Sequence, residues 1–174
     1  MDLKNKVALI TGANRGIGKE TARALASAGA RVMLTGRDEA ALATVQAEIK
    51  GSGGQALALS GDLRKESDIA AITKHCVETL GGIEILVNNA GIGHFAPVAE
   101  LSTAHWDEMF ELNIRGVFLM TRAALPSLRA AGESVIVNVA SLAGKNAFPG
   151  GGGYAATKHA LLGFSRCLML EERK

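Results

Sequence analysis

The stretch TGANRGIG, Thr11 to Gly18, joins a short apolar run to an amphipathic helical pattern. Its glycines let the backbone turn sharply and approach a pyrophosphate, whose charge the free N–H groups and positive end of the following helix would stabilise. The spacing G-x-x-x-G-x-G differs from the common dinucleotide fingerprint and from the P-loop. The stretch predicts a phosphate-binding turn between strand and helix, with a tight connection that binds nothing as the alternative.

Outward from this turn, short apolar runs alternate with longer helical patterns along the whole chain. Continuous apolar strands separated by helices are typical of a parallel sheet covered on both faces. The pattern therefore predicts an α/β fold with a doubly wound parallel sheet, as a single domain over residues 1–174. The expected strands are 6–11, 31–36, 55–60, 84–89 and 134–141, and the expected helices are 18–29, 39–50, 68–81, 106–132 and a last one from about Tyr154.

Two kinds of residue are expected to end helices. Gly29, Gly51 and Gly132 stand where a left-handed C-cap is wanted. Pro126 lies inside the fourth helical pattern and should kink or end it, because proline removes a backbone donor and clashes with the preceding turn.

The composition of the chain argues against several classes of function. The net charge of +2 is spread along the chain, so neither a nucleic-acid face nor an anionic-membrane patch is indicated. The first residues suit a buried strand and not a signal sequence, and no apolar stretch reaches membrane-spanning length, which predicts a cytoplasmic protein. Cys76 and Cys167 lack a C-x-x-C spacing and are expected to be buried, small apolar residues.

The end of the second strand indicates which nucleotide is bound. An NAD site usually places a carboxylate there, whereas this chain has Gly36 followed by Arg37, with Arg15 available from the glycine turn. Two guanidinium groups favour the 2'-phosphate of NADP(H) over NAD(H). Asp62 could accept a hydrogen bond from the adenine amino group, or could instead cap a helix beside Leu63.

The stretch GGGGYAATKHALLGF, Gly150 to Phe164, contains the only tyrosine of the chain, directly after four glycines. Tyr154 and Lys158 are four residues apart and would share one face of a helix, whose first turn the glycines leave open. A tyrosine phenol has a pKa of about 10, so an acid–base role near neutral pH needs a nearby cation. Lys158 is that candidate cation.

Together, TGANRGIG, NNAG (Asn88 to Gly91), Asn113, Ser141 and YAATK resemble the short-chain dehydrogenase/reductase family. The resemblance runs from about Val7 to the last residue and implies a Rossmann-like fold. It also implies hydride transfer between NADP(H) and a carbonyl or secondary alcohol, for which 3-oxoacyl thioesters, ketones, quinones and sugars are all candidate substrates.

The resemblance also assigns roles. Tyr154 would protonate the carbonyl oxygen, Ser141 would hydrogen-bond it, Lys158 would hold the nicotinamide ribose, and Asn113 would support a water in a proton relay. Taken singly, these could instead be a turn serine, a half-exposed amphipathic pair and a mid-helix asparagine. The expected cofactor contacts are Gly12, Asn14, Arg15, Gly16, Ile17, Gly18, Arg37, Asp62, Leu63, Asn89, Ala90, Gly91, Tyr154 and Lys158.

The histidines and the last helix bear on metal binding and on oligomeric state. No histidine has metal-ligand spacing, which predicts no metal site. His94 and Phe95 are expected to be surface-loop residues, with a place beside the substrate cleft as the alternative. The last helix is apolar on more than one face, which predicts a homodimer or homotetramer, as the family resemblance also implies.

Complete members of the family continue after this helix with further strands, a proline-glycine turn and a segment that closes over substrate. The sequence therefore predicts a fold that is C-terminally incomplete relative to the family. A fragment of a longer protein is favoured over a natural truncation, because all catalytic residues are in place and an open sheet edge favours aggregation. The sequence is compatible with two functions: the reductase, and a non-catalytic NADP(H)-binding module or scaffold.

Overall fold

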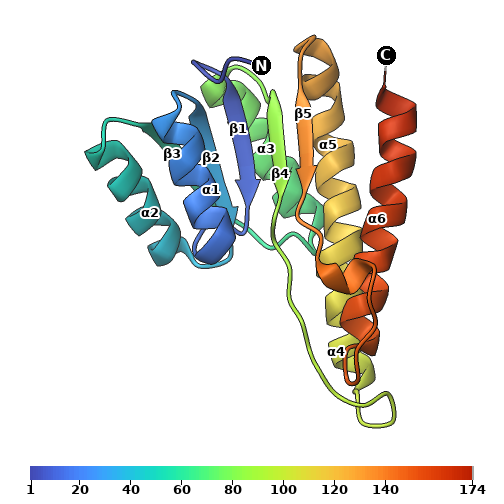
Figure 1. The fold of residues 1–174 in the computed structure, drawn as a ribbon. Coiled ribbons are helices and arrows are strands. Elements are labelled where there is room, and N and C mark those ends of the chain that lie inside the picture. The colour runs from blue at the N-terminus through green and yellow to red at the C-terminus, as the bar shows by residue number, and fades with distance from the viewer. Residues whose placement is uncertain (174) are drawn as a thin grey trace.

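The structure is a computed structural model that describes residues 1–173, and it contains a five-stranded parallel sheet in the order β3-β2-β1-β4-β5 (Figure 1). The strands are β1 (Val7–Thr11), β2 (Arg31–Gly36), β3 (Gln55–Ser60), β4 (Ile85–Asn88) and β5 (Val135–Asn138). The helices are α1 (Gly16–Ser27), α2 (Glu39–Gly51), α3 (Glu66–Leu80), α4 (Thr103–Phe110), α5 (Val117–Ala130) and α6 (Gly152–Glu172). This is the doubly wound α/β fold that the sequence predicts.

Alternate side chains of the central strands enter two cores on opposite faces of the sheet. Leu9 and Leu86 belong to the core that contains residues of α3 and α5. Ile10 belongs to the core that contains residues of α1 and α2. Helix α6 runs beside α5 at the β5 side of the sheet (Figure 1). Burial on both faces explains why the strands read as continuous apolar runs.

The order of the strands indicates where a ligand-binding crevice is expected. The chain moves from β1 outward to β2 and β3, and then returns to the other side of β1 with β4 and β5. In open parallel sheets, ligands bind outside the carboxyl ends of the strands at the point where the order reverses. That point lies between β1 and β4, whose carboxyl ends carry the TGANRGIG and NNAG motifs.

The expected helix ends hold in part. Gly29 and Gly132 follow α1 and α5 with φ of 91° and 77°, in the left-handed conformation. Helix α2 also ends at Gly51, but the left-handed conformation predicted for this glycine is wrong, because Ser52 follows as the cap residue and the left-handed residue is Gly53, with φ of 82°. Pro126 does not end its helix, since α5 runs on to Ala130. Burial of Leu128 in the core anchors the turn beyond the proline.

The single helix expected over 106–132 is interrupted by a π-helical turn, Glu111–Gly116, between α4 and α5. A π-turn takes one extra residue into the hydrogen-bonded ring and often lies at a functional site. Asn113 lies in this turn and is buried.

Strand β5 forms one edge of the sheet. Its register with β4 pairs Ile85 with Val135 and Val87 with Val137. Ile85 and Val87 are buried in one core, whereas Val135 and Val137 are 41% and 43% exposed. One face of β5 is therefore open.

Candidate functional site

The glycine turn is packed too tightly for other residues at two of its positions. A Cβ added to Gly18 would lie 2.3 Å from the Gly12 carbonyl oxygen, and one added to Gly12 would lie 2.9 Å from the Ala90 Cα. Gly12 and Gly16 also have φ of 63° and 56°, which favours glycine. The turn therefore brings bare backbone to the carboxyl edge of the sheet.

The NNAG segment fastens this turn from the neighbouring strand. The Asn89 Nδ2 donates to the Thr11 and Gly12 carbonyl oxygens at 2.9 and 3.2 Å. The Thr11 Oγ1 in turn accepts from the backbone N–H groups of Asn89 and Ala90 at 2.9 and 3.0 Å. These four bonds hold the two motifs together. The sequence alone does not reveal this role of Thr11, because a hydroxyl at the end of a buried strand forms no motif of its own.

A cavity of about 440 Å³ opens beside the turn. At the start of α1, the N-cap residue Arg15 makes no side-chain capping bond, so the first N–H groups of the helix lack that partner. Of the predicted nucleotide contacts, Gly18, Tyr154 and Lys158 lie outside the cavity lining. The lining comprises Gly12, Asn14, Arg15, Gly16, Ile17, Gly36, Arg37, Asp38, Gly61, Asp62, Leu63, Asn89, Ala90, Gly91, Ile92 and Leu112.

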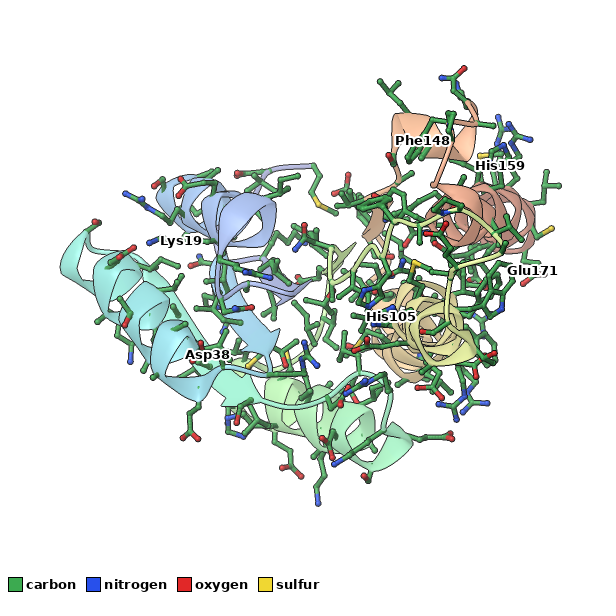
Figure 2. The ribbon with its side chains drawn as sticks, turned by 90° about the horizontal axis from the view of Figure 1, so that it is seen from below. Lys19, Asp38, His105, Phe148, His159 and Glu171 are labelled. Carbon is green, nitrogen blue, oxygen red and sulfur yellow. The ribbon has the colours of Figure 1, made fainter. Side chains whose placement is uncertain are left out.

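The charged residues of this lining differ in what they already bind. Arg15 and Arg37 are both exposed and line the cavity. Asp38 follows β2, but its carboxylate accepts from the Ala41 N–H at 2.9 Å and caps α2. Figure 2 shows Asp38 at the start of that helix. The acid nearest the end of β2 is therefore engaged in a helix cap, while two arginines line the cavity.

Asp62 is held by its neighbour Arg64. The guanidinium donates to both carboxylate oxygens, with an Nη2–Oδ2 distance of 2.6 Å, and this hydrogen bonding keeps the pKa of Asp62 below its ordinary value. The alternative in which Asp62 caps the following helix is wrong, because α3 begins at Glu66 with Lys65 at the cap position. The role of Asp62 toward adenine stays a prediction.

Tyr154 and Lys158 lie one turn apart in α6, as their spacing predicts. The Lys158 Nζ lies 5.7 Å from the centre of the Tyr154 ring and donates to the Val139 carbonyl oxygen at 2.9 Å. Lys158 is only 6% exposed, and burial lowers the pKa of its ammonium group. The lysine is therefore a fixed internal group next to a half-buried phenol, and the alternative of a half-exposed lysine in an amphipathic pair is wrong.

Asn113 connects the π-turn to the segment after β4. Its Nδ2 donates to the Ile92 carbonyl oxygen and to the Thr157 Oγ1, at 2.8 and 3.1 Å, and its Oδ1 accepts from the Ile92 N–H at 2.9 Å. A Cβ added to Gly91 would lie 3.2 Å from Asn113 Oδ1 and 3.8 Å from Lys158 Nζ. Gly91, Asn113 and Lys158 therefore meet at one point.

Ser141 follows β5 and caps a short 3-10 helix, Leu142–Gly144. Its Oγ accepts from the Ala143 N–H at 3.1 Å. The serine lies two residues beyond Val139, whose carbonyl oxygen binds Lys158. A turn role is thus present, and the bond to a substrate oxygen stays a prediction.

The four glycines before Tyr154 are not an open stretch. Gly151 and Gly153 are buried, and a Cβ at Gly151 would lie 2.4 Å from the Phe148 ring. A Cβ at Gly153 would lie 2.4 Å from the Met109 methyl group. The expectation that the glycines leave the first turn of α6 open holds only for Gly152, which is exposed, because side chains from other segments cover Gly151 and Gly153.

Comparison with known proteins identifies the family of this chain. A family model for the short chain dehydrogenases matches residues 6–174. The chain belongs to the short-chain dehydrogenase/reductase family. An uncharacterised oxidoreductase of Listeria monocytogenes is 37% identical over 171 residues, and a 3-oxoacyl-[acyl-carrier-protein] reductase of Synechocystis is 35% identical over 170 residues. These matches cover 98% and 97% of this chain and 69% of each relative.

Solved structures of the family agree with this fold. A metagenomic short-chain oxidoreductase in complex with NADP is 40% identical, with a TM-score of 0.94 over 99% of this chain and 79% of the other. A short-chain dehydrogenase/reductase of Burkholderia phymatum in complex with NAD is 32% identical, with a TM-score of 0.96 over 99% of this chain and 62% of the other.

His94 is more than a surface-loop residue in this member of the family. Its Nε2 lies 2.9 Å from the Glu108 Oε2, and its ring stacks on His105 with centres 4.0 Å apart. The bond to His94 keeps the pKa of Glu108 below its ordinary value. Within residues 1–173, no group of three or more His, Cys, Asp or Glu side chains is arranged to hold a metal ion.

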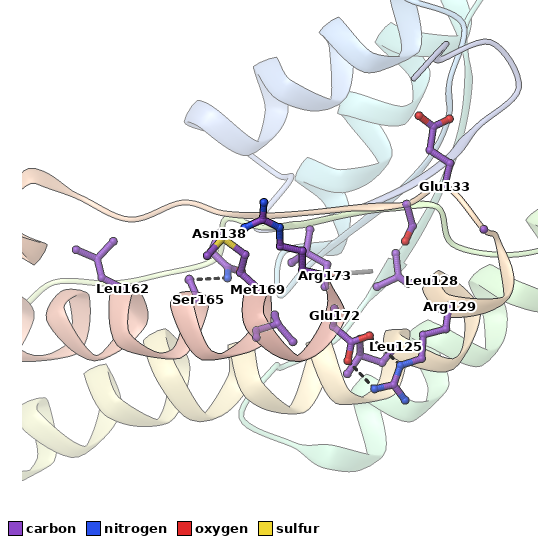
Figure 3. A pocket seen from close by; sticks show the side chains of 14 residues that line it. Leu125, Leu128, Arg129, Glu133, Asn138, Leu162, Ser165, Met169, Glu172 and Arg173 are labelled. Atoms are coloured by element: carbon purple, nitrogen blue, oxygen red, sulfur yellow. Dashed lines mark hydrogen bonds and ion pairs between the residues drawn. The ribbon is translucent and has the colours of Figure 1, made fainter.

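A larger hollow of about 640 Å³ lies between α5, β5 and α6 (Figure 3). Its wall combines apolar residues such as Leu125, Leu162 and Met169 with polar and charged ones, and an Arg129–Glu172 ion pair lies at one end. None of the residues predicted for cofactor or catalysis lines it. We therefore place the candidate site in the smaller cavity, where the glycine turn, NNAG and Arg37 meet.

The surface of this short-chain dehydrogenase/reductase offers some apolar side chains to a partner. Phe118 on α5 and Leu170 on α6 are 42% and 71% exposed. The homodimer or homotetramer stays a prediction. Among the helices within residues 1–173, none combines the length and apolar character needed to cross a membrane.

The two cysteines are expected to differ in reactivity. Cys76 is buried, and burial raises the pKa of its thiol to about 12, whereas Cys167 is exposed, so the prediction of burial is wrong for Cys167. Because the thiolate is the reactive form, one thiol per folded chain should react with a thiol-specific disulfide reagent, and both should react after denaturation. The folded Cys167→Ser variant should not react. Equal rates for both thiols in the folded wild type would contradict this prediction.

Proposed function

We propose that this protein is an NADP(H)-dependent oxidoreductase that interconverts a carbonyl compound and its secondary alcohol, with Tyr154 as general acid and base. The observation that carries the proposal is the position of Gly91. This residue lines the nucleotide cavity and lies against both Asn113 and Lys158. Gly91 thus connects the nucleotide cavity with the lysine that lies beside the phenol.

The residues present fit a dinucleotide. The close approach at Gly12 and Gly18 leaves room for backbone only, as a pyrophosphate cradle requires, and the start of α1 has no side-chain cap. Relatives named as oxidoreductases, and family structures in complex with NADP and NAD, support the same cofactor class. A nicotinamide dinucleotide supplies or accepts the hydride when it is bound.

The side chains of the site have separate roles in the reaction. The Tyr154 phenol donates its proton to the carbonyl oxygen in reduction and accepts it from the alcohol in oxidation. The Lys158 ammonium stabilises the phenolate that results, because the two groups share one helix face. Ser141 holds the same substrate oxygen by a hydrogen bond. Asn113 fixes the backbone at Ile92 and, through Thr157, the start of α6.

The candidate substrates are 3-oxoacyl thioesters, ketones, quinones and sugars. The 3-oxoacyl-[acyl-carrier-protein] reductase name of the Synechocystis relative supports a 3-oxoacyl thioester. We would follow NADPH consumption with 2,3-butanedione, a quinone and a 3-oxoacyl thioester. Turnover of at least one of them supports the reductase. Saturable NADPH binding without turnover of any carbonyl compound would support a nucleotide-binding module instead.

Arg37 is expected to select NADPH. Arg37 lines the cavity together with Arg15, while the Asp38 carboxylate is engaged in the α2 cap. Because a charge-assisted hydrogen bond contributes about 1.5–3 kcal/mol, Arg37→Ala should weaken NADPH binding by about 10- to 100-fold. NADH binding should change by less than about twofold, since NADH lacks the 2'-phosphate. Fluorescence titration with each nucleotide measures both values.

Arg23→Ala is the matched control for this titration. Arg23 lies on α1, pairs with Glu20 at the surface and is not a lining residue of the cavity. Its removal should leave both affinities unchanged. Equal binding of NADPH and NADH by the wild type would remove the basis for the NADP(H) preference.

A further inference from the structure

Two phenylalanine rings stand exposed next to the proposed acid. Phe95 and Phe148 are 61% and 43% exposed. Phe95 comes from the segment between β4 and α4, and Phe148 from the segment between the short 3-10 helix and α6. Figure 2 labels Phe148 near the first turns of α6. The ring centres are 6.0 Å apart and the planes are inclined by 44°. We refer to this pair as the aromatic rim.

Each ring of the aromatic rim rests on a glycine. A Cβ at Gly93 would lie 2.7 Å from the Phe95 Cζ, and one at Gly151 would lie 2.4 Å from the Phe148 Cζ. Any larger residue at these positions would displace the ring above it. Each ring therefore packs against the backbone at a defined position, although much of its surface is exposed.

The aromatic rim adjoins the phenol directly. The Phe95 ring meets the Tyr154 ring edge to face, with centres 5.5 Å apart and planes at 66°. A Cβ at Gly93 would also lie 3.2 Å from the Tyr154 Cδ2. A carbonyl compound whose oxygen bonds to the Tyr154 hydroxyl thus has its substituents within reach of Phe95 and Phe148.

We propose that the aromatic rim selects carbonyl substrates that carry a flat apolar group, an aryl group above all, on the carbonyl carbon. This inference rests on the proposed function. Aromatic rings favour offset or edge-to-face contact with another ring, which an aryl substituent supplies and a methyl group does not. A charged substituent would lose hydration against these rings and gain no ionic partner from them.

The test compares two diketones with the same reacting group, 1-phenyl-1,2-propanedione and 2,3-butanedione. The wild type should reduce the phenyl compound with a kcat/KM about 10-fold higher or more, as expected for added apolar contact in a pocket. Phe95→Ala and Phe148→Ala should each remove most of this preference through KM, with little change in kcat or in the rate with 2,3-butanedione. Phe118 on α5 is about as exposed as Phe148, and Phe118→Ala should leave the preference unchanged.

A binding measurement separates failure of the rim from failure of the reductase. Saturation-transfer NMR with 1-phenyl-1,2-propanedione, with and without NADPH, reports contact with the protein whether or not turnover occurs. If both rim variants lost this signal and the wild type showed no turnover, the binding role of the aromatic rim would be supported and the proposed reductase activity would be overturned. If active rim variants kept the phenyl preference, or if their NMR signal were unchanged, the proposal that the aromatic rim selects the substrate would be overturned. If the aromatic rim served only self-association, the two rim variants would differ from the wild type in the mass measured by light scattering and would keep the phenyl preference. That result would also overturn the proposal.

Discussion

Replacing Tyr154 with phenylalanine should lower kcat/KM for carbonyl reduction by about 100- to 10,000-fold, the range that a positioned general acid contributes. The substitution removes one oxygen atom and keeps the ring. Tyr154 is the only tyrosine in the chain, so no second phenol can replace its proton. The loss should appear in kcat, because the proton is transferred in the transition state and not on binding.

The surroundings of Tyr154 should survive this change. The edge-to-face contact with Phe95 and the position of Lys158 over the ring both involve the ring and not the hydroxyl. Within residues 1–173, no hydrogen bond joins the phenol oxygen to another group, so its removal leaves no buried partner unpaired. The free energy of unfolding should therefore change by less than about 0.5 kcal/mol.

The measurement pairs steady-state kinetics with nucleotide binding. Tyr154→Phe should bind NADPH with the affinity of the wild type, because Tyr154 does not line the nucleotide cavity. Normal binding without turnover separates loss of the acid from loss of the fold. A variant that retained more than about a tenth of the wild-type kcat would exclude Tyr154 as the proton donor, since general acid catalysis contributes at least about 100-fold.

The sequence predicts the fold well where a local pattern decides it. The expected strands 31–36 and 55–60 match β2 and β3 at both ends, because each apolar run is bounded by glycine or polar residues. Helix starts next to glycines are less certain, because glycine suits both a turn and a first helical residue. Helices α1 and α6 thus begin two residues earlier than expected, at Gly16 and Gly152.

The π-turn could not be predicted from periodicity. Its extra residue accompanies contacts between distant segments, in which the Asn113 side chain binds both backbone groups of Ile92. The same holds for His94, which reaches Glu108 only when the segment after β4 folds back onto α4. Motif spacing located Tyr154 and Lys158, but the burial of Lys158 became visible only in the packed structure.

The glycine turn offers the second large effect, through Gly18→Ala. The added methyl group would lie 2.3 Å from the Gly12 carbonyl oxygen and 2.5 Å from the Asn89 Nδ2. The first of these atoms belongs to the backbone and cannot rotate away, so the turn itself must move. Because displacement of a positioning element by about 1 Å can cost about 100-fold, we expect a loss of that order in NADPH affinity.

The same substitution should also lower the stability of the fold. Overpacking a tight site typically costs about 1–3 kcal/mol, and the turn is tied to β4 through Asn89, so the strain reaches the centre of the sheet. Chemical denaturation of the variant measures the free energy of unfolding. Titration with NADPH under folding conditions measures the affinity separately.

Gly163→Ala is the matched control, because the chemical change is the same and the surroundings are open. Gly163 lies inside α6, and a Cβ there meets no atom within 4 Å. Alanine is the better helix former, so this variant should gain about 0.5–1 kcal/mol in unfolding free energy and bind NADPH normally. If Gly18→Ala bound NADPH as tightly as Gly163→Ala does, the close contact beneath the turn would not be required for binding. The pyrophosphate would then have to be held elsewhere in the cavity.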